Sequence, residues 1–139
     1  MMIYVVIQFF AILFLVVNAQ IEKFDIFSAV LLTFSLIIGI TALINMKLAN
    51  LNILPTFKDG HQLVTTGLYR YIRHPMYTSV IFLCFSLLLT NLSIINQLVM
   101  LILIIDLWLK SSFEERLLLA QFDDYQNYQK STARFLPFI

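Results

Sequence analysis

An uncharged apolar run at Ile26–Met46 is the feature that most constrains how this chain folds. About 20 apolar residues in helical form cross the hydrocarbon core of a bilayer, and this run reaches that length. Hydrophobic residues make up 60% of the 139 positions and charged residues only 12%, which is far too apolar for a soluble domain of this size. The run therefore predicts a transmembrane helix.

Three further apolar spans flank this run. Met1–Ala19 is interrupted only by Gln8 and Asn18, and it lacks the basic start and the cleavage site of a signal peptide. Pro75–Thr90 and Leu98–Leu109 are shorter and are separated by polar residues, so they favour a helical hairpin whose full crossing of the bilayer the sequence leaves open. We therefore expect an all-α integral membrane helical bundle with about four transmembrane helices.

Composition excludes several classes of function. A net charge of +1 argues against a nucleic-acid partner, which would require a basic face. A single cysteine, Cys84, provides neither a disulfide framework nor a zinc cluster, so no metal site is expected. The three glycines do not form a Gly-x-Gly-x-x-Gly loop, which leaves no argument for a Rossmann dinucleotide fold.

Basic residues gather on one side of the expected bundle. With four spans, the N-terminus, the segment 47–74 and the tail share that side, which holds eight of the nine Lys and Arg residues. The positive-inside rule makes this side cytoplasmic. We therefore expect a protein of the cell inner membrane whose site faces the cytoplasm. The eight residues are Lys47, Lys58, Arg70, Arg73, Lys110, Arg116, Lys130 and Arg134.

A basic and aromatic segment, 67–77, lies at the start of the third span. Two Arg, one His and three Tyr fall within nine of its residues. Pro75 suits the first turn of a helix and keeps the preceding residue out of the helical conformation. We expect Arg73 and His74 to lie at the cap of a membrane helix, facing a polar ligand. The preceding stretch 61–67 is expected to form an extended strap that ends in a glycine turn, with a loop on the membrane surface as the alternative.

Three charged residues at helical spacing follow in the fourth span. Asp106, Lys110 and Glu114 share one face of a helix, and a buried acid at position 106 is costly unless Lys110 pairs with it. One interpretation is a functional set, and the other is a charge ladder that only neutralises Asp106. For Glu114 the simpler interpretation is a helix cap, a role that Glu115 fits at least as well.

The tail is expected to form an amphipathic helix. Ser111 or Ser112, with Glu114 or Glu115 three residues on, matches a capping box, so a helix can restart there. An apolar stripe at helical spacing follows and predicts packing against the membrane or a neighbouring helix. This stripe consists of Leu118, Phe122, Tyr125 and Tyr128.

Two ordered motifs carry a resemblance to a known family. His61 to Tyr69 follows the pattern His-x-Leu-Val-Thr-x-Gly-x-Tyr, Arg73 to Tyr77 the pattern Arg-His-Pro-x-Tyr, and the pair Glu114-Glu115 lies downstream. Together with the tail aromatics, this set resembles the isoprenylcysteine carboxyl methyltransferase family of membrane enzymes and its phospholipid methyltransferase relatives. The similarity covers about residues 45–139.

The resemblance implies an S-adenosylmethionine-dependent methyltransferase core at 47–139. The apolar spans predict two transmembrane helices at 1–46 before it. Lys110 stands where the family has an arginine that meets a substrate carboxylate, and Arg73 is the second candidate catalytic cation. Phe122-Asp123 replaces the usual Phe-Gly, with one residue fewer before Tyr125. The implied cofactor contacts are His61, Gln62, Leu63, Val64, Tyr69, His74, Pro75, Met76, Tyr77 and Glu114.

The acceptor expected from these residues is a lipidic carboxylate that reaches the site from the bilayer. A carboxylate nucleophile needs no deprotonation at neutral pH, and Lys110 can orient it. Three alternatives remain open: a phospholipid amine as acceptor, a fold-related membrane reductase that uses a nicotinamide cofactor, and a small membrane protein without enzymatic activity. The last would use the segment 67–77 only as an interfacial anchor.

Overall fold

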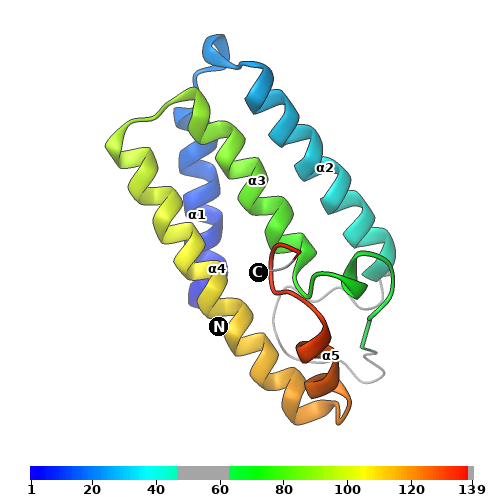
Figure 1. Cartoon of the computed structure of the whole chain (residues 1–139). Helices are drawn as coiled ribbons and strands as arrows, with labels where there is room; N and C mark the ends of the chain where they lie inside the picture. The colour runs from blue at the N-terminus through cyan, green and yellow to red at the C-terminus, as the bar shows by residue number, and fades with distance from the viewer. Residues whose placement is uncertain (47–62, 138–139) are drawn as a thin grey trace.

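The computed structural model describes residues 1–46 and 63–137, which form a helical bundle with a short C-terminal appendage (Figure 1). Within this part of the chain there is no β-strand, and one isolated parallel bridge joins Ile72 to Ala133. The all-α fold class is therefore confirmed. The elements are α1 (Met2–Asn18), η1 (Ile21–Lys23), α2 (Ile26–Met46), η3 (Gly67–Arg70), α3 (Pro75–Thr90), α4 (Ile94–Gln121) and α5 (Tyr125–Ser131), where η marks a 3-10 helix.

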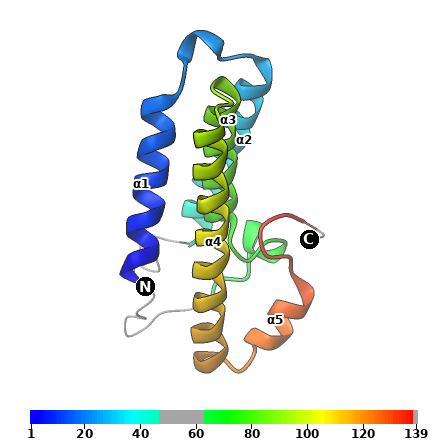
Figure 2. The same cartoon turned by 90° about the vertical axis from the view of Figure 1, so that its left-hand side faces the viewer.

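The four long helices run side by side. α2 packs along α3, and α1 packs along α4, while α3 also contacts α1 and α4 (Figures 1 and 2). The N-terminus and the tail lie toward the same end of the bundle, where α5 leaves the lower part of α4 (Figure 2). This end also holds the start of α3, so the segment 67–77 and the tail come together there.

Two of these helices are long and apolar enough to cross a membrane: α2 and α4. α1 and α3 are shorter apolar helices. The outward surface of α2 is apolar, with Phe34 55% exposed, whereas the residues it buries are small: Ser28, Ser35 and Ala42. Lipid tails are as apolar as leucine, so membrane helices pack through small residues while large apolar ones face outward. α2 and α4 are therefore candidate spans, and the expected four transmembrane helices stay a prediction.

Reciprocal serine hydrogen bonds join α2 to α3. Ser35 Oγ donates to the carbonyl of Ser79, and Ser79 Oγ donates to the carbonyl of Ser35, each at 2.8 Å. Gly39 lies one turn further along α2, and a Cβ atom there would come within 2.7 Å of Ser79 Oγ. The close approach of the two backbones therefore depends on small side chains, as is common between membrane helices.

α4 is one continuous helix, and this corrects two expected interruptions. Ser93 is its N-cap, so Asn96 and its neighbour fall in the first turn rather than in the connecting loop. No helix restarts at the two serines, because Ser111 Oγ and Ser112 Oγ each donate to the carbonyl of Trp108 within the same helix. A serine that bonds back to the preceding turn is tolerated inside a helix and does not cap it.

The expected amphipathic tail helix is also divided. α4 ends at Gln121, Phe122 adopts an extended conformation, and the short helix α5 begins at Tyr125. The stripe of apolar residues therefore spans two elements. Tyr125 is almost fully buried, and its ring meets that of Tyr128 edge to face at 5.7 Å. The turn lets the tail fold back toward the start of α3.

Candidate functional site

The predicted helix start at Pro75 is confirmed. His74 is the N-cap of α3 and Pro75 occupies its first turn, where its missing N–H would have had no partner within the helix. The tail lies alongside this cap, because Arg73 N–H donates to the carbonyl of Ala133 at 2.9 Å and His74 N–H donates to that of Arg134 at 3.1 Å. Two stretches far apart in the sequence thus form one polar surface at the end of α3.

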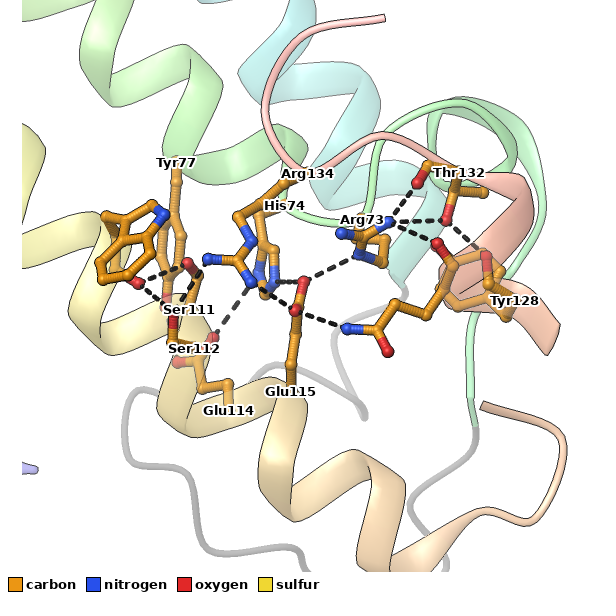
Figure 3. A network of polar contacts seen from close by, with 12 residues as sticks. Arg73, His74, Tyr77, Ser111, Ser112, Glu114, Glu115, Tyr128, Thr132 and Arg134 are labelled. Atoms are coloured by element: carbon orange, nitrogen blue, oxygen red, sulfur yellow. Dashed lines mark hydrogen bonds and ion pairs between the residues drawn. The ribbon is translucent and has the colours of Figure 1, made fainter. Parts of the chain in front are cut away.

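Glu114 joins this surface to α4. The hydroxyl of Tyr77 donates to Glu114 Oε1 at 2.5 Å, and His74 Nδ1 lies 3.7 Å from Glu114 Oε2 (Figure 3). The rings of His74 and Tyr77 stack with centroids 5.3 Å apart, as their spacing of three residues on a helix start allows. Phe135 from the tail packs against both rings. His74, Tyr77 and Glu114, three residues predicted to contact the cofactor, are therefore neighbours.

Glu115 is the centre of the buried polar network, which corrects its expected role as a helix cap. Its side chain is only 3% exposed and lies inside α4. Oε1 accepts from Arg73 Nε at 2.8 Å and lies 3.2 Å from His74 Nε2. Oε2 accepts from Arg134 Nη2 at 2.8 Å and from Gln129 Nε2 at 3.0 Å (Figure 3). One carboxylate thus holds α3, α4, α5 and the tail together.

Arg73 is bonded within the protein through Nε and Nη1. Besides Glu115, its guanidinium donates through Nη1 to the carbonyls of Gln129 and Thr132. Such bonds hold the tail against the start of α3, since a buried guanidinium is stable only when its donors are satisfied. Contact between Arg73 and a ligand stays a prediction. Its present contacts are those of a positioning residue.

Lys110 does not form the expected ion pair with Asp106. Lys110 Nζ donates to Gln8 Oε1 of α1 at 3.1 Å and lies over the ring of Tyr77 at 4.9 Å from the centroid. Asp106 is 4% exposed, and neither carboxylate oxygen has a hydrogen-bond partner among the described residues. The lysine instead bridges Gln8 of α1 to Tyr77 of α3, one helical turn from Glu114.

The strap is described only in part. His61 and Gln62 lie outside the described residues, and Leu63 and Val64 are half-buried without regular structure. The expected glycine turn is present, because Gly67 has a φ of 62°, a conformation that side chains other than glycine rarely adopt. A Cβ atom at Gly67 would also come within 2.2 Å of the side-chain nitrogen of Asn45.

Tyr69 follows this turn in η3 and carries a buried hydroxyl. The residue is 4% exposed, and its hydroxyl is buried without a partner in the described structure. Burial, and next the nearby hydroxyl of Tyr128, raise the pKa of Tyr69, so the hydroxyl stays protonated and can donate. The backbone of Tyr69 is fixed by Tyr128, whose hydroxyl donates to the Tyr69 carbonyl at 2.5 Å.

The two remaining predicted contacts follow His74 directly. Pro75 is buried and Met76 is half-buried at the start of α3. The predicted residues His74, Tyr77 and Glu114 come together here, whereas Glu115 and the residues from the tail were not predicted to take part. A Glu-Glu pair facing an Arg-His pair was a signal for the network, whereas nothing in the sequence pointed to the tail partners. The missed residues are Gln129, Thr132, Arg134 and Phe135.

The site combines a partly exposed carboxylate with aromatic rings. The Glu114 side chain is 20% exposed, unlike that of Glu115, and two stacked rings lie beside it. A carboxylate can accept from hydroxyl or amino groups of a ligand, and an aromatic face attracts a cation. Over residues 1–46 and 63–137, no group of three or more His, Cys, Asp or Glu is arranged to hold a metal ion.

The family profile of phospholipid methyltransferases matches residues 24–124, a range that includes α2, α3 and the whole of α4. The chain belongs to the phospholipid methyltransferase family. A search of curated proteins finds no match. The resemblance to phospholipid methyltransferases is confirmed, and membership indicates a membrane-associated methyltransferase. In this phospholipid methyltransferase family member, the residues brought together by α3 and α4 lie almost entirely within the matched region.

Proposed function

We propose that this protein transfers a methyl group from S-adenosylmethionine to a lipidic acceptor at the membrane surface. The observation that carries the proposal is the contact between Tyr77 and Glu114, with His74 stacked on the tyrosine ring. It joins the Arg-His-Pro-x-Tyr motif to the Glu-Glu pair of a methyltransferase family member. The site is proposed to face the cytoplasm, where a soluble cofactor is available, at the inner membrane of the cell.

The residues present fit this cofactor. Glu114 retains acceptor capacity beyond its bond to Tyr77 and would accept from the amino or ribose groups. The partnerless hydroxyl of Tyr69 would find a partner on the ligand. The faces of His74 and Tyr77 would lie beside the adenine or the sulfonium. Pro75, Met76 and the strap residues 61–64 are proposed to complete the contacts.

Bound S-adenosylmethionine supplies a methyl group on a positively charged sulfur, which a nucleophile displaces directly. The protein must therefore align an acceptor and keep water out, more than it must supply an acid or a base. Phe135 covers the rings of His74 and Tyr77, and the carbonyl of Phe135 accepts from Thr78 Oγ1, so the tail is tied over the site. A lipid acceptor can arrive between helices, because its tail already lies in the bilayer.

The first candidate acceptor is a lipidic carboxylate oriented by Lys110. Lys110 is 6% exposed and lies one turn from Glu114 on α4, so its charge points into the bundle beside the proposed cofactor residues. Its bond to Gln8 holds the ammonium in place. A lysine provides the charge of the family arginine but not its two-pronged geometry, so it would bind one oxygen of the carboxylate.

The second candidate is a phospholipid amine, and Asp106 favours it. A carboxylate buried in an apolar helix without a hydrogen-bond partner is costly, and a membrane-depth acid of this kind is commonly functional. It lies one turn deeper in α4 than Lys110 and would attract the ammonium group of an approaching amine. The amine must lose a proton before it attacks, and a carboxylate can accept that proton.

Calorimetric titration of the purified protein tests the cofactor. We expect binding of S-adenosylmethionine and of its demethylated product, and no binding of NADPH. The combined substitution His74→Ala and Tyr77→Phe should weaken S-adenosylmethionine binding while the protein still melts cooperatively. Unchanged affinity in this variant would contradict the proposal, and binding of NADPH alone would favour the reductase alternative.

The chemical stability of the transferred methyl group separates the two acceptors. Membranes are incubated with protein and with S-adenosylmethionine labelled in the methyl group, and the extracted lipids are treated with mild base. A methyl ester releases its label as volatile methanol, whereas an N-methyl group stays on the lipid headgroup. Label in neither lipid fraction, with cofactor binding intact, would contradict a lipidic acceptor.

A further inference from the structure

A groove lined by apolar and basic residues lies beside the site, between η3 and the C-terminal segment. The groove has a volume of about 410 Å³. Arg70 and Tyr71 form one wall, and Lys130, Ser131 and Thr132 form the other. The tail lies next to the segment that precedes α3 in both views of the fold (Figures 1 and 2). None of these residues belongs to the proposed cofactor site around Glu114.

Among the described residues that line the groove, Arg70 and Lys130 are charged and there is no Asp or Glu. Both Arg70 and Lys130 are exposed. The ion pairs within the described residues use Arg73, His74 and Arg134 instead. Two cations that face one groove without a carboxylate repel each other, so an anion bound between them would be favoured.

The walls of the groove are fixed relative to each other by the backbone. Ala133 N–H donates to the carbonyl of Tyr71 at 3.0 Å, next to the parallel bridge between Ile72 and Ala133. On the tail side, Ser131 Oγ and Thr132 Oγ1 each donate to the carbonyl of Tyr128. The backbone segments that carry the two cations are therefore held together by the fold rather than by a flexible loop, which lowers the entropic cost of binding.

The groove lies where the helices would leave the bilayer. η3 contacts α2, and the groove wall continues directly into the start of α3. Tyr71 is 61% exposed, and Leu136 of the tail is 39% exposed. Exposed aromatic and apolar residues next to Arg and Lys are typical of the layer in which lipid headgroups lie.

We propose that this groove binds the phosphate of an anionic lipid headgroup, at a site separate from the methyl acceptor. The guanidinium of Arg70 can donate two parallel hydrogen bonds to phosphate oxygens, and Lys130 adds a point charge from the opposite wall. The headgroup rests against Tyr71 while the acyl chains lie along the apolar end of the bundle. Such a lipid anchors the tail that covers the site, and its binding does not depend on methyl transfer.

Titration with phosphatidylglycerol, followed by native mass spectrometry of the detergent-solubilised protein, tests the proposal. We expect the protein to bind phosphatidylglycerol more tightly than phosphatidylcholine. The exposed groove charges can be removed by Arg70→Gln and Lys130→Gln, and each substitution should weaken phosphatidylglycerol binding about fivefold. The charge-preserving substitutions Arg70→Lys and Lys130→Arg should retain most of the phosphatidylglycerol binding.

Lys23→Gln is the matched control, because Lys23 is an exposed basic residue at the opposite end of the bundle, in η1. It should bind phosphatidylglycerol as the parent does. Equal binding by the parent and by the doubly substituted groove would overturn the proposal. A second arm adds inorganic phosphate at millimolar concentration, and protection from melting by phosphate alone, without a lipid preference, would overturn the assignment to a lipid.

Discussion

Arg73 Nε donates to Glu115 Oε1 at 2.8 Å, and this bond joins the start of α3 to the interior of α4. The second oxygen of Glu115 accepts from Arg134, so the tail is held by the same carboxylate. Glu115 therefore positions the neighbouring Glu114 and the ring of His74 without itself being open to a ligand. Of these two adjacent acids on one helix, Glu115 has a structural role and Glu114 is the one proposed to bind the cofactor.

The first prediction separates these two glutamates by stability. Glu115→Gln removes the charge that compensates Arg73 and Arg134, and breaking such a buried network costs about 3 kcal/mol or more. Glu114→Gln keeps an acceptor for the Tyr77 hydroxyl and should cost about 1 kcal/mol or less. Thermal melting in detergent measures both. A Glu115→Gln variant that melts with the parent would contradict the central role of this carboxylate.

The effects on cofactor affinity should have the reverse order of the effects on stability. Glu114 is the proposed ligand contact, so Glu114→Gln should lower affinity more than Glu115→Gln. Glu114→Gln should weaken S-adenosylmethionine binding by about 1.5–3 kcal/mol, because a charge-assisted hydrogen bond is lost. Lys110→Met should leave this affinity nearly unchanged while turnover falls, since Lys110 is proposed to meet the acceptor. If both variants only lower the melting temperature and keep the parent affinity, Lys110 and Glu114 have a structural role alone.

Asp106→Asn distinguishes the two acceptors. The substitution replaces a buried carboxylate that lacks a partner, so the melting temperature should stay the same or rise. If the acceptor is an amine, N-methylation should fall roughly tenfold or more, equal to about 1.4 kcal/mol in transition-state stabilisation. If it is a carboxylate, ester formation should persist in this variant. The base-lability assay distinguishes the two products.

Substitutions of Tyr69 and Tyr128 should have different effects, one on cofactor binding and the other on stability. Tyr128→Phe loses the hydrogen bond to the Tyr69 carbonyl and should cost about 1 kcal/mol of stability. Burial is the main factor that raises the pKa of Tyr128 to about 12, so this bond is present throughout the neutral range. Tyr69→Phe removes a hydroxyl without a partner and should leave stability intact while weakening S-adenosylmethionine binding. Identical effects of the two substitutions would contradict this division.

Gly67→Ala should destabilise the turn for two separable reasons. The positive φ disfavours alanine by about 1–2 kcal/mol, and the new methyl group would overlap the side chain of Asn45. Adding Asn45→Ala should relieve the overlap but not the backbone strain. A double-mutant cycle on melting temperature therefore predicts partial recovery, and no coupling between the two positions would contradict the close approach.

Regular structure in the N-terminal half could be predicted from the sequence. The run at Ile26–Met46 is α2 without a shift at either end, and Met1–Ala19 differs from α1 by one residue at each end. Long uncharged segments leave the backbone few choices, because only a helix satisfies its own hydrogen bonds in an apolar medium. The break at Pro75 was equally predictable, since it rests on the local sterics of proline.

The C-terminal half was less predictable. Its sequence patterns reflect neighbours along the chain, whereas its side-chain contacts join segments that are far apart in the sequence. Ser111 matched a capping box, yet its hydroxyl bonds within α4. Asp106 and Lys110 have the spacing of an ion pair, yet Lys110 turns to Gln8, more than a hundred positions away in the sequence. A helix face limits which side chains are near each other, but the neighbouring helix decides which of them bond.

The sequence by itself determined the two N-terminal helices, the helix start at Pro75, the family motifs and the side chains available to the site. Only the tertiary structure decided that Glu115 is enclosed and Glu114 is partly open, because this depends on how the tail folds back over the start of α3. It also decided that Arg73 bonds within the protein to Glu115, and that Arg134 bonds to the same carboxylate. The reason is physical: each buried charge takes the nearest partner that packing provides, and partners from separate segments have no fixed spacing in the sequence.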